Sequence, residues 1–210
     1  MLSLVDRLSN TGHAGFVNGT QVIRAESRAI AAIRSVRPAD LTALSGFFED
    51  LSVESRYLRF FAPVRPTSGL LHMLSGGPAN VHAVVAVVDG VIVGHAMAAD
   101  QTEPADPCGA RVTDVGVVVA DAWQRRGVGT ALMRALIARA QARGVTSLAM
   151  DVLPGNRRVI AMITGHWPDA VIGRSPDGLD ISIQLPRRQS PPAQVPLAPQ
   201  PVRPLVTVGG

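Results

Sequence analysis

The stretch from Val115 to Ala142 constrains the fold of this 210-residue chain more than any other segment. It begins with V-G-V-V-V, an apolar and β-branched run that predicts a buried strand. It continues through Q-R-R-G-V-G-T (residues 124–130) into apolar residues at helical spacing, which predict a helix over Gly127–Ala142 that stops at Gly144. A buried strand that leads directly into a helix is typical of an α/β protein.

The other periodic segments place this strand and helix in a mixed sheet. Before them we expect a strand at 32–37, helices opening at Pro38, Ser52 and Thr67, and a hairpin of 81–88 with 91–99. After them we expect a strand at 146–152, a helix from Asn156, and a hairpin of 170–172 with 179–185. Asp89-Gly90 is a preferred two-residue hairpin turn, and the nearly continuous apolar strands beside it indicate burial on both faces. The sequence therefore predicts an α/β fold with a mixed central β-sheet flanked by helices.

The two ends of the chain lack this regular pattern. Residues 1–30 show no sustained period, although Asn18-Gly19 indicates a small hairpin, so we expect an N-terminal arm. Residues 186–210 contain seven prolines, which is typical of a disordered or polyproline-like tail. Asp6 and Arg7 interrupt the apolar run that a signal peptide needs, so we expect a cytoplasmic protein with no membrane partner.

Composition removes several kinds of chemistry. All 20 basic residues are arginine, so the chain has no Schiff-base lysine, no P-loop lysine and no lysine general base. A net charge of +4 over the whole length does not predict a nucleic-acid partner, since such proteins concentrate their charge in a patch. The one cysteine, Cys108, excludes an intrachain disulfide and a multi-cysteine zinc site, and the scattered histidines have no metal-ligand spacing.

The glycine-containing turn at 124–130 indicates a site for phosphate groups. The first N–H groups of the following helix point outward, Gly127 and Gly129 let ligand oxygens approach, and Arg125 and Arg126 add positive charge. The plain alternative is a tight turn whose glycines serve packing alone. A dinucleotide motif needs a third glycine and a Walker loop needs a lysine, and this turn has neither. The sequence therefore predicts a pyrophosphate site.

Q-R-R-G-V-G in a strand–turn–helix, with Asn156 after the next strand, resembles the coenzyme-A-binding core of the GNAT superfamily of acyltransferases. L-S-V-E-S-R-Y-L-R-F-F (51–61) and I-R-S-V-R-P-A-D (33–40) are similar to the bacterial protein-lysine acetyltransferase (Pat-like) branch. The resemblance implies the GNAT fold over residues 31–185, with a splayed strand pair at the acyl-CoA site. It also implies an N-acetyltransferase that uses acetyl-CoA as cosubstrate and no metal, and that acetylates an amine, in this branch a protein lysine.

The resemblance also implies roles for the residues that match the motifs. The turn would hold the pyrophosphate and the preceding strand would pair with the pantetheine arm, beside Asn156. These cofactor-binding candidates are Val117, Val118, Val119, Gln124, Arg125, Arg126, Gly127, Val128, Gly129, Thr130 and Asn156. The general base of this branch is a glutamate ten residues before the turn glutamine, and here that position is Asp114. A base is needed because freeing a lysine amine of pKa ~10.4 at pH 7 costs about 4.6 kcal/mol.

The sequence departs from the family pattern at the acid. Many members place a tyrosine in the last helix to protonate the departing thiolate, but residues 156–168 contain none, which leaves water or His166. An edge-of-sheet carboxylate without chemistry is the plain alternative for Asp114, which also replaces the usual glutamate. Two alternative functions stay open: acetylation of a small amine such as an antibiotic or polyamine, and a non-catalytic acyl-CoA-binding sensor.

Overall fold

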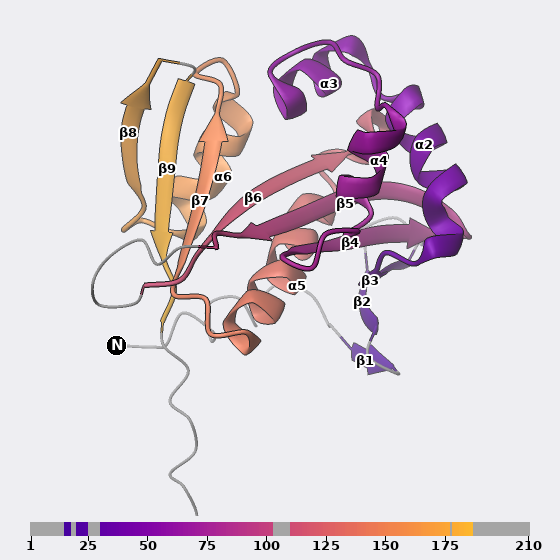
Figure 1. The fold of residues 1–210 in the computed structure, drawn as a ribbon, viewed down its shortest axis with the longest axis horizontal. Coiled ribbons are helices and arrows are strands. Elements are labelled where there is room, and N and C mark those ends of the chain that lie inside the picture. Colours follow the sequence, from indigo (N-terminus) through magenta and orange to yellow (C-terminus); the bar gives the residue numbers. More distant parts are fainter. Residues whose placement is uncertain (1–14, 18–19, 25–29, 103–109, 177, 187–210) are drawn as a thin grey trace, which may run out of the picture.

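The computed structural model of the protein describes residues 15–17, 20–24, 30–102, 110–176 and 178–186 (Figure 1). Its strands form one sheet in the order β1-β2-β3-β4-β5-β6-β7-β9-β8. Strands β6 and β7 run parallel, and the other neighbouring pairs are antiparallel. The bounds are β1 Gly15–Val17, β2 Thr20–Arg24, β3 Ile30–Ser35, β4 Val81–Val88, β5 Val91–Asp100, β6 Val112–Val119, β7 Ser147–Val152, β8 Val171–Ser175 and β9 Gly178–Gln184. The predicted mixed sheet is confirmed.

Helices cover both faces of the sheet (Figure 1). One face carries α2 and α4, which share an apolar cluster with β4, β5 and β6, and α3 lies at the same side over the end of β6. The other face carries α5 and α6, whose apolar side chains pack on β4, β5, β7 and β9. The bounds are η1 Pro38–Asp40, α2 Leu41–Asp50, α3 Val53–Phe60, α4 Ser68–Leu74, η2 Asp121–Trp123, α5 Val128–Ala142 and α6 Arg157–His166.

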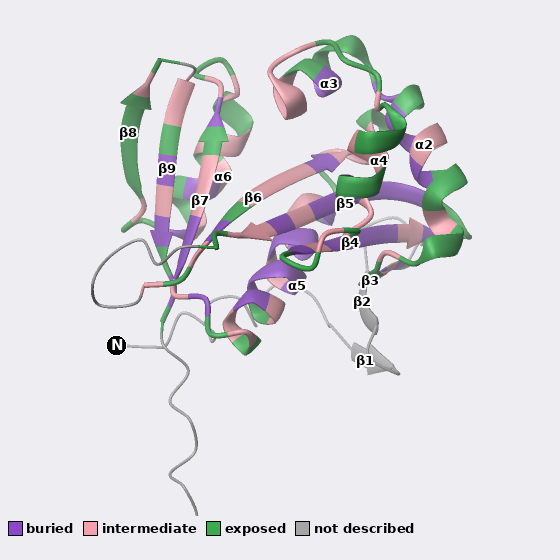
Figure 2. Ribbon diagram, in the orientation of Figure 1, coloured by how far each residue is buried: buried purple, intermediate pink, exposed green. Residues whose placement is uncertain are grey.

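The hairpin of β4 and β5 forms the centre of the sheet and is buried on both faces, as the sequence predicts (Figure 2). Its turn is made by Asp89 and Gly90, whose φ angles of 47° and 83° belong to the left-handed region that a two-residue turn of this kind requires. Val88 and Val91 pair directly beside that turn.

Helix α5 approaches the sheet closely over Gly94 of β5. A Cβ atom at this position would lie 2.9 Å from Cδ1 of Leu132 and 3.3 Å from Cγ1 of Val128. Both side chains are buried in the core. Because Val128 is the first residue of α5, this contact also fixes where the helix begins, and with it the turn that joins β6 to α5.

The segment I-R-S-V-R-P-A-D forms a tie between β3 and the first helices. The guanidinium of Arg34 donates to both oxygens of Asp40, at 2.6 and 2.8 Å, and the backbone N–H of Arg37 donates to the same carboxylate at 2.7 Å. The hydrogen bond from Arg34 holds the pKa of the Asp40 carboxyl below its usual value. Residues 33–40, which resemble the protein-lysine acetyltransferase branch, therefore have a structural role.

The predicted N-terminal arm contributes two strands to the sheet. Strand β2 pairs with β3, and β1 pairs with β2 with Val17 opposite Thr20, on either side of Asn18-Gly19. Cys108 and the tail from residue 187 onward lie outside the described residues. Within the part of the chain that the structure describes, no helix combines the length and hydropathy that crossing a membrane requires.

A Gly94→Ala variant tests the close approach of α5. The added methyl group has no room beside Leu132, so we expect the free energy of unfolding to fall by about 1–3 kcal/mol. Gly46→Ala is the matched control, because Gly46 lies within α2 with open space around it and should gain about 0.5–1 kcal/mol. Urea unfolding of both variants measures the difference. Equal stability of Gly94→Ala and the wild type would contradict this account of the packing.

Candidate active site

Strands β6 and β7 pair over three residues and then diverge. Their register joins Val112 to Ser147, Thr113 to Leu148 and Asp114 to Ala149. Beyond Asp114, β6 continues paired with β5 alone, while β7 stays paired with β9 to its end. The two strands consequently open into a V, which is visible in Figure 1. The splayed strand pair that the sequence resemblance implies is therefore present.

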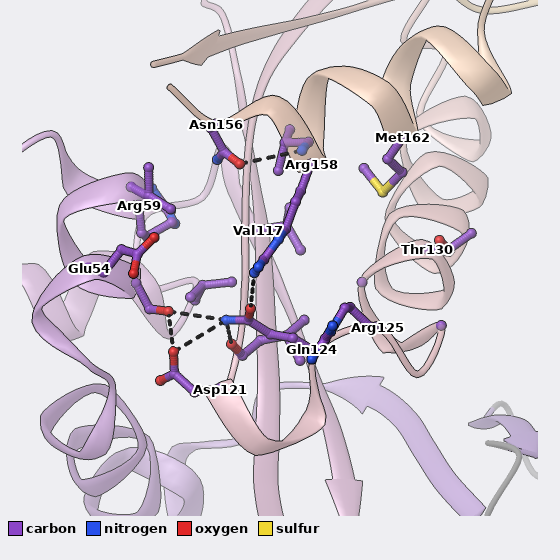
Figure 3. A pocket seen from close by; sticks show the side chains of 17 residues that line it. Glu54, Arg59, Val117, Asp121, Gln124, Arg125, Thr130, Asn156, Arg158 and Met162 are labelled. Atoms are coloured by element: carbon purple, nitrogen blue, oxygen red, sulfur yellow. Dashed lines mark hydrogen bonds between the residues drawn. The ribbon is translucent and has the colours of Figure 1, made fainter. Parts of the chain in front are cut away.

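A cavity of about 520 Å³ lies where the strands diverge (Figure 3). Its three walls are α3, the C-terminal part of β6 together with the turn into α5, and the N-terminal part of α6. In Figure 3, Glu54 and Arg59 lie on one side of the cavity, and Thr130 and Met162 lie on the opposite side. The lining residues are Glu54, Ser55, Leu58, Arg59, Val117, Val118, Val119, Asp121, Gln124, Arg125, Gly127, Gly129, Thr130, Asn156, Arg158, Val159 and Met162.

The turn into α5 presents an uncapped helix N-terminus to this cavity. Gly127 is the N-cap residue with φ of 79°, and no side chain accepts a hydrogen bond there. Arg125 also has a positive φ, 61°, which is unusual for a residue other than glycine. The first N–H groups of a helix have no acceptor within the helix, and the helix dipole makes this end attractive to anions. The free N–H groups of this turn can therefore donate to an anionic ligand.

The structure brings most of the predicted cofactor-binding residues to the cavity. Those that line it are Val117, Val118, Val119, Gln124, Arg125, Gly127, Gly129, Thr130 and Asn156. Two do not. The side chain of Val128 is buried in the core, and the guanidinium of Arg126 lies 5.1 Å from the centre of the Trp123 ring.

Asp114 lies at the point where the two strands part and does not line the cavity. Its exposed carboxylate accepts two long hydrogen bonds from Gln101 Nε2, at 3.3 and 3.4 Å. Side chains alternate between the faces of a strand, and Val115 and Val117 pack among the apolar clusters under α5 and α6. Asp114 therefore shares with Gly116 the opposite face of β6, which is the side of α3.

Asp121 ties α3 to the turn. Its carboxylate accepts hydrogen bonds from the backbone N–H of Ser52 at 3.0 Å, from the Ser52 hydroxyl at 2.8 Å and from the Ser55 hydroxyl at 2.7 Å. Burial raises the pKa of the Asp121 carboxyl, but the hydrogen bonds from these serines outweigh burial, so the pKa lies below its ordinary value. The two serines of the S-x-E-S motif therefore position the helix that forms one wall of the cavity.

The side chain of Gln124 joins all three walls (Figure 3). Its Nε2 donates to the Ser55 hydroxyl at 3.1 Å and to the carbonyl of Val119 at 3.2 Å, and its Oε1 accepts from Arg158 at 3.5 Å. The amide group is consequently occupied by protein partners from α3, β6 and α6. This places Gln124 as a brace between the walls.

Sequence reasoning missed the residues that α3 and α6 contribute. From α3 these are Glu54, Leu58 and Arg59, and from α6 they are Arg158, Val159 and Met162. Residues 54, 58 and 59 lie close to one helical face, and that spacing is visible in the sequence. Which face of α3 meets β6 depends on the hydrogen bonds to Asp121, which join residues 66 and 69 positions apart.

The remaining acid candidates lie away from the cavity. Nδ1 of His166 is hydrogen-bonded to the carbonyl of Met162 at 2.9 Å, and Tyr57 is exposed on α3. Neither side chain lines the cavity. Among the described residues, no three His, Cys, Asp or Glu side chains gather as a metal site would require.

A splayed parallel strand pair that opens beside an uncapped helix N-terminus is the arrangement that the sequence resemblance implies for an acyltransferase with a phosphate-bearing cosubstrate. The profile of the acetyltransferase (GNAT) family matches residues 45–164, which is more than half of the chain. The chain belongs to this acetyltransferase family, and both the predicted fold and the predicted enzyme class are confirmed.

Several known proteins are similar to this chain. Acetyltransferase Pat from Mycolicibacterium smegmatis is 29% identical over 138 residues, which are 64% of this chain and 41% of that protein, so the chain spans less than half of its length. The crystal structure of the GNAT domain of S. lividans PAT has a TM-score of 0.70 and 26% identity, covering 81% of this chain and all of that domain. The fold also matches yncA from Salmonella typhimurium, solved with acetyl-CoA, at a TM-score of 0.57 and 18% identity over 78% of this chain and 98% of yncA.

An Asp121→Ala variant tests the tie between α3 and the turn. It leaves one N–H and two hydroxyl groups without their acceptor, so we expect a loss of about 1–2 kcal/mol in the free energy of unfolding at pH 7. Because the folded protein lowers the pKa of this carboxyl, the stabilisation is present above ~pH 4 and is lost as the pH falls through the lowered pKa.

Urea unfolding at pH 7 and near pH 3 measures both effects. Asp169→Asn is the control, because it removes an exposed carboxylate far from this network and should leave the stability unchanged. A stability difference between Asp121→Ala and the wild type that does not shrink in acid would contradict the role of the carboxylate.

Proposed function

We propose that this protein is an acetyl-CoA-dependent N-acetyltransferase and that its acceptor is the side-chain amine of a protein lysine. The observation that carries the proposal is the cavity that joins the glycine turn to residues 117–119 of β6, beyond the point where this strand stops pairing with β7. We infer that it accepts a ligand whose phosphates lie at the turn and whose reactive group points toward the place where the strands part. Membership of the GNAT family and the acetyl-CoA bound to yncA support acetyl-CoA as this ligand.

The residues of the cavity suit the parts of acetyl-CoA. Backbone N–H groups at Val128, Gly129 and Thr130 would receive the pyrophosphate, with Arg125 beside them. Beyond Asp114 the edge of β6 facing β7 is unpaired, so the backbone at 117–119 offers hydrogen bonds to the amides of the pantetheine arm. Asn156 would flank the arm from the start of α6.

Asp114 is the proposed general base. Its carboxylate is exposed and lies at the level where the thioester end of the arm would arrive, and among the described residues it accepts two long hydrogen bonds from Gln101. Because it stands outside the cavity lining, we propose that it takes the amine proton through a water molecule. The amine then attacks the thioester carbonyl directly.

Protein lysine as the acceptor is supported by the resemblance of residues 33–40 and 51–61 to the bacterial protein-lysine acetyltransferase branch. A small amine and a non-catalytic sensor remain the competing functions. Purified protein is mixed with acetyl-CoA and, separately, lysine-containing peptides, polyamines and aminoglycosides. Thiol release and the mass of the acceptor are then followed. We expect acetylated peptide lysine; transfer only to small amines, or acetyl-CoA binding without transfer, would overturn the proposal in favour of one of the others.

A Gly127→Ala variant tests the phosphate end of the cavity. Gly127 has φ of 79°, so a side chain there strains the turn and should weaken acetyl-CoA binding by about three- to tenfold. Gly144→Ala is the matched control, because Gly144 has φ of 82° just after the other end of α5. We expect equal losses of stability and, by calorimetry, weakened binding only in Gly127→Ala. Equal affinities in the two variants would place the phosphates elsewhere.

An Asp114→Asn variant tests the base, with Glu54→Gln beside it because Glu54 is an exposed carboxylate that does line the cavity. We expect Asp114→Asn to keep acetyl-CoA affinity and to lose about 10²–10⁴-fold in kcat. Glu54→Gln should keep kcat within about threefold. A larger loss in Glu54→Gln than in Asp114→Asn would transfer the role of base to α3.

A further inference from the structure

Arg59 is a cation without a neutralising partner at the cavity. It lies in the last turn of α3 and lines the cavity. Its Nε is buried with no acceptor, and no hydrogen bond or ion pair joins Arg59 to another residue that the structure describes. Burial lowers the pKa of its guanidinium to about 10, so the group still carries its charge at neutral pH. The residue as a whole is partly exposed and lines the cavity, so the positive charge of its guanidinium is available to a negative group there.

The guanidinium lies directly on Gly116 of β6. A Cβ atom at Gly116 would come within 2.5 Å of Cζ and Nη2 of Arg59, so the missing side chain provides the space that Arg59 occupies. Its other face has the ring of Phe60, whose centre is 5.0 Å from Cζ. Gly116 is two residues from Asp114 and three residues from Val119, where β6 ends. Three residues of strand span about 10 Å, so Gly116 lies about 10 Å from the start of the turn. Arg59 therefore stands at the reacting end of the cavity, far from the phosphates.

Among the described residues, no charged or titratable group around Arg59 forms an ion pair that would neutralise its positive charge. Glu54 on the same helix forms no ion pair with it, although both line the cavity. Asp114 lies on the same face of β6, where its carboxylate accepts hydrogen bonds from Gln101. His95 of β5 is fully buried, and burial lowers the pKa of its imidazole to about 3, so it is neutral.

The opposite wall offers no acid for a departing sulfur. The residues from α6 that line the cavity are Asn156, Arg158, Val159 and Met162. Asn156 caps the helix by accepting from the N–H of Val159, and Arg158 donates to Gln124 at the turn. Of the three arginines that line the cavity, Arg125 and Arg158 lie at the turn, and Arg59 lies at the reacting end.

We propose that Arg59 stabilises the negative charge on the sulfur that departs from the thioester. This inference rests on the proposed function and adds a catalytic residue to it. The amine nitrogen forms a bond to the carbonyl carbon, the carbon–sulfur bond breaks, and its electron pair goes to sulfur. The amine proton leaves through water to Asp114. Arg59 keeps its own proton and acts by charge and hydrogen bonding, so no tyrosine is needed.

The experiment measures the thiol pKa of bound coenzyme A, which depends on the charge around the sulfur and requires no acceptor. Thiolate absorbance is followed against pH in the complex and corrected with the free protein, because Cys108 also titrates. In the wild type we expect a thiol pKa below that of free coenzyme A. Arg59→Met should raise it by about one unit or more, and Arg59→Lys should restore part of the shift.

Two further measurements separate this role from a structural one. Arg59→Met should retain coenzyme A binding by calorimetry, lower kcat by about ten- to a hundredfold, and unfold at an unchanged temperature, because it breaks no hydrogen bond or ion pair with the described residues. Gly116→Ala should also raise the thiol pKa, because its methyl group displaces the guanidinium while the charge stays in the protein. Arg174→Met, at an exposed arginine of β8, is the matched control and should change none of these values.

The outcomes decide between the two proposals. Equal thiol pKa values in the wild type and Arg59→Met, with coenzyme A bound to both, would overturn the role of Arg59 and leave the proposed function standing. Loss of coenzyme A binding in Arg59→Met would make Arg59 a binding residue and would also overturn the role. If the wild type itself does not bind coenzyme A, the proposed function fails, and the inference fails with it.

Discussion

The site depends on one constraint, which is that β6 and β7 stop pairing after Asp114 and Ala149. Two parallel strands that stayed paired would leave no room between α3 and α6. Their divergence leaves one edge of β6 without a strand partner while the other edge stays bonded to β5. The glycine turn then lies at the top of the opening and Arg59 lies near its base. The cavity, with its proposed phosphate end and reacting end, is a consequence of that single divergence.

Close contacts made by residues without side chains keep this arrangement in place. Gly94 lets α5 pack directly on β5, which fixes the start of that helix, and Gly116 gives space to Arg59. Hydrogen bonds to Asp121 and Gln124 then hold α3 and α6 against the turn. The polar network and the packing contacts both act on α3 and on the turn into α5, so the walls of the cavity are positioned together.

Much of the fold could be predicted from the sequence because its signals are local. Helical and strand periodicity, caps at Ser52 and Thr67, and the Asp89-Gly90 turn each depend on neighbouring residues, and the structure agrees with them. The turn at 124–130 could be found for the same reason. Arg59 could not be, because its importance comes from the absence of a partner, and only the assembled sheet shows which groups surround it. Likewise, the close approach of α5 to Gly94 depends on how two separate elements pack, which no local pattern reveals.

The open edge of β6 makes the sheet incomplete by part of a strand. A ligand whose amides bond to that edge takes the place of the missing strand, so it contributes to the cohesion of the sheet as well as to the chemistry. Any molecule that binds the folded chain and not the unfolded chain shifts the folding equilibrium in proportion to its supply. Under the proposed function, acetyl-CoA would therefore stabilise the folded chain as well as supply the acetyl group.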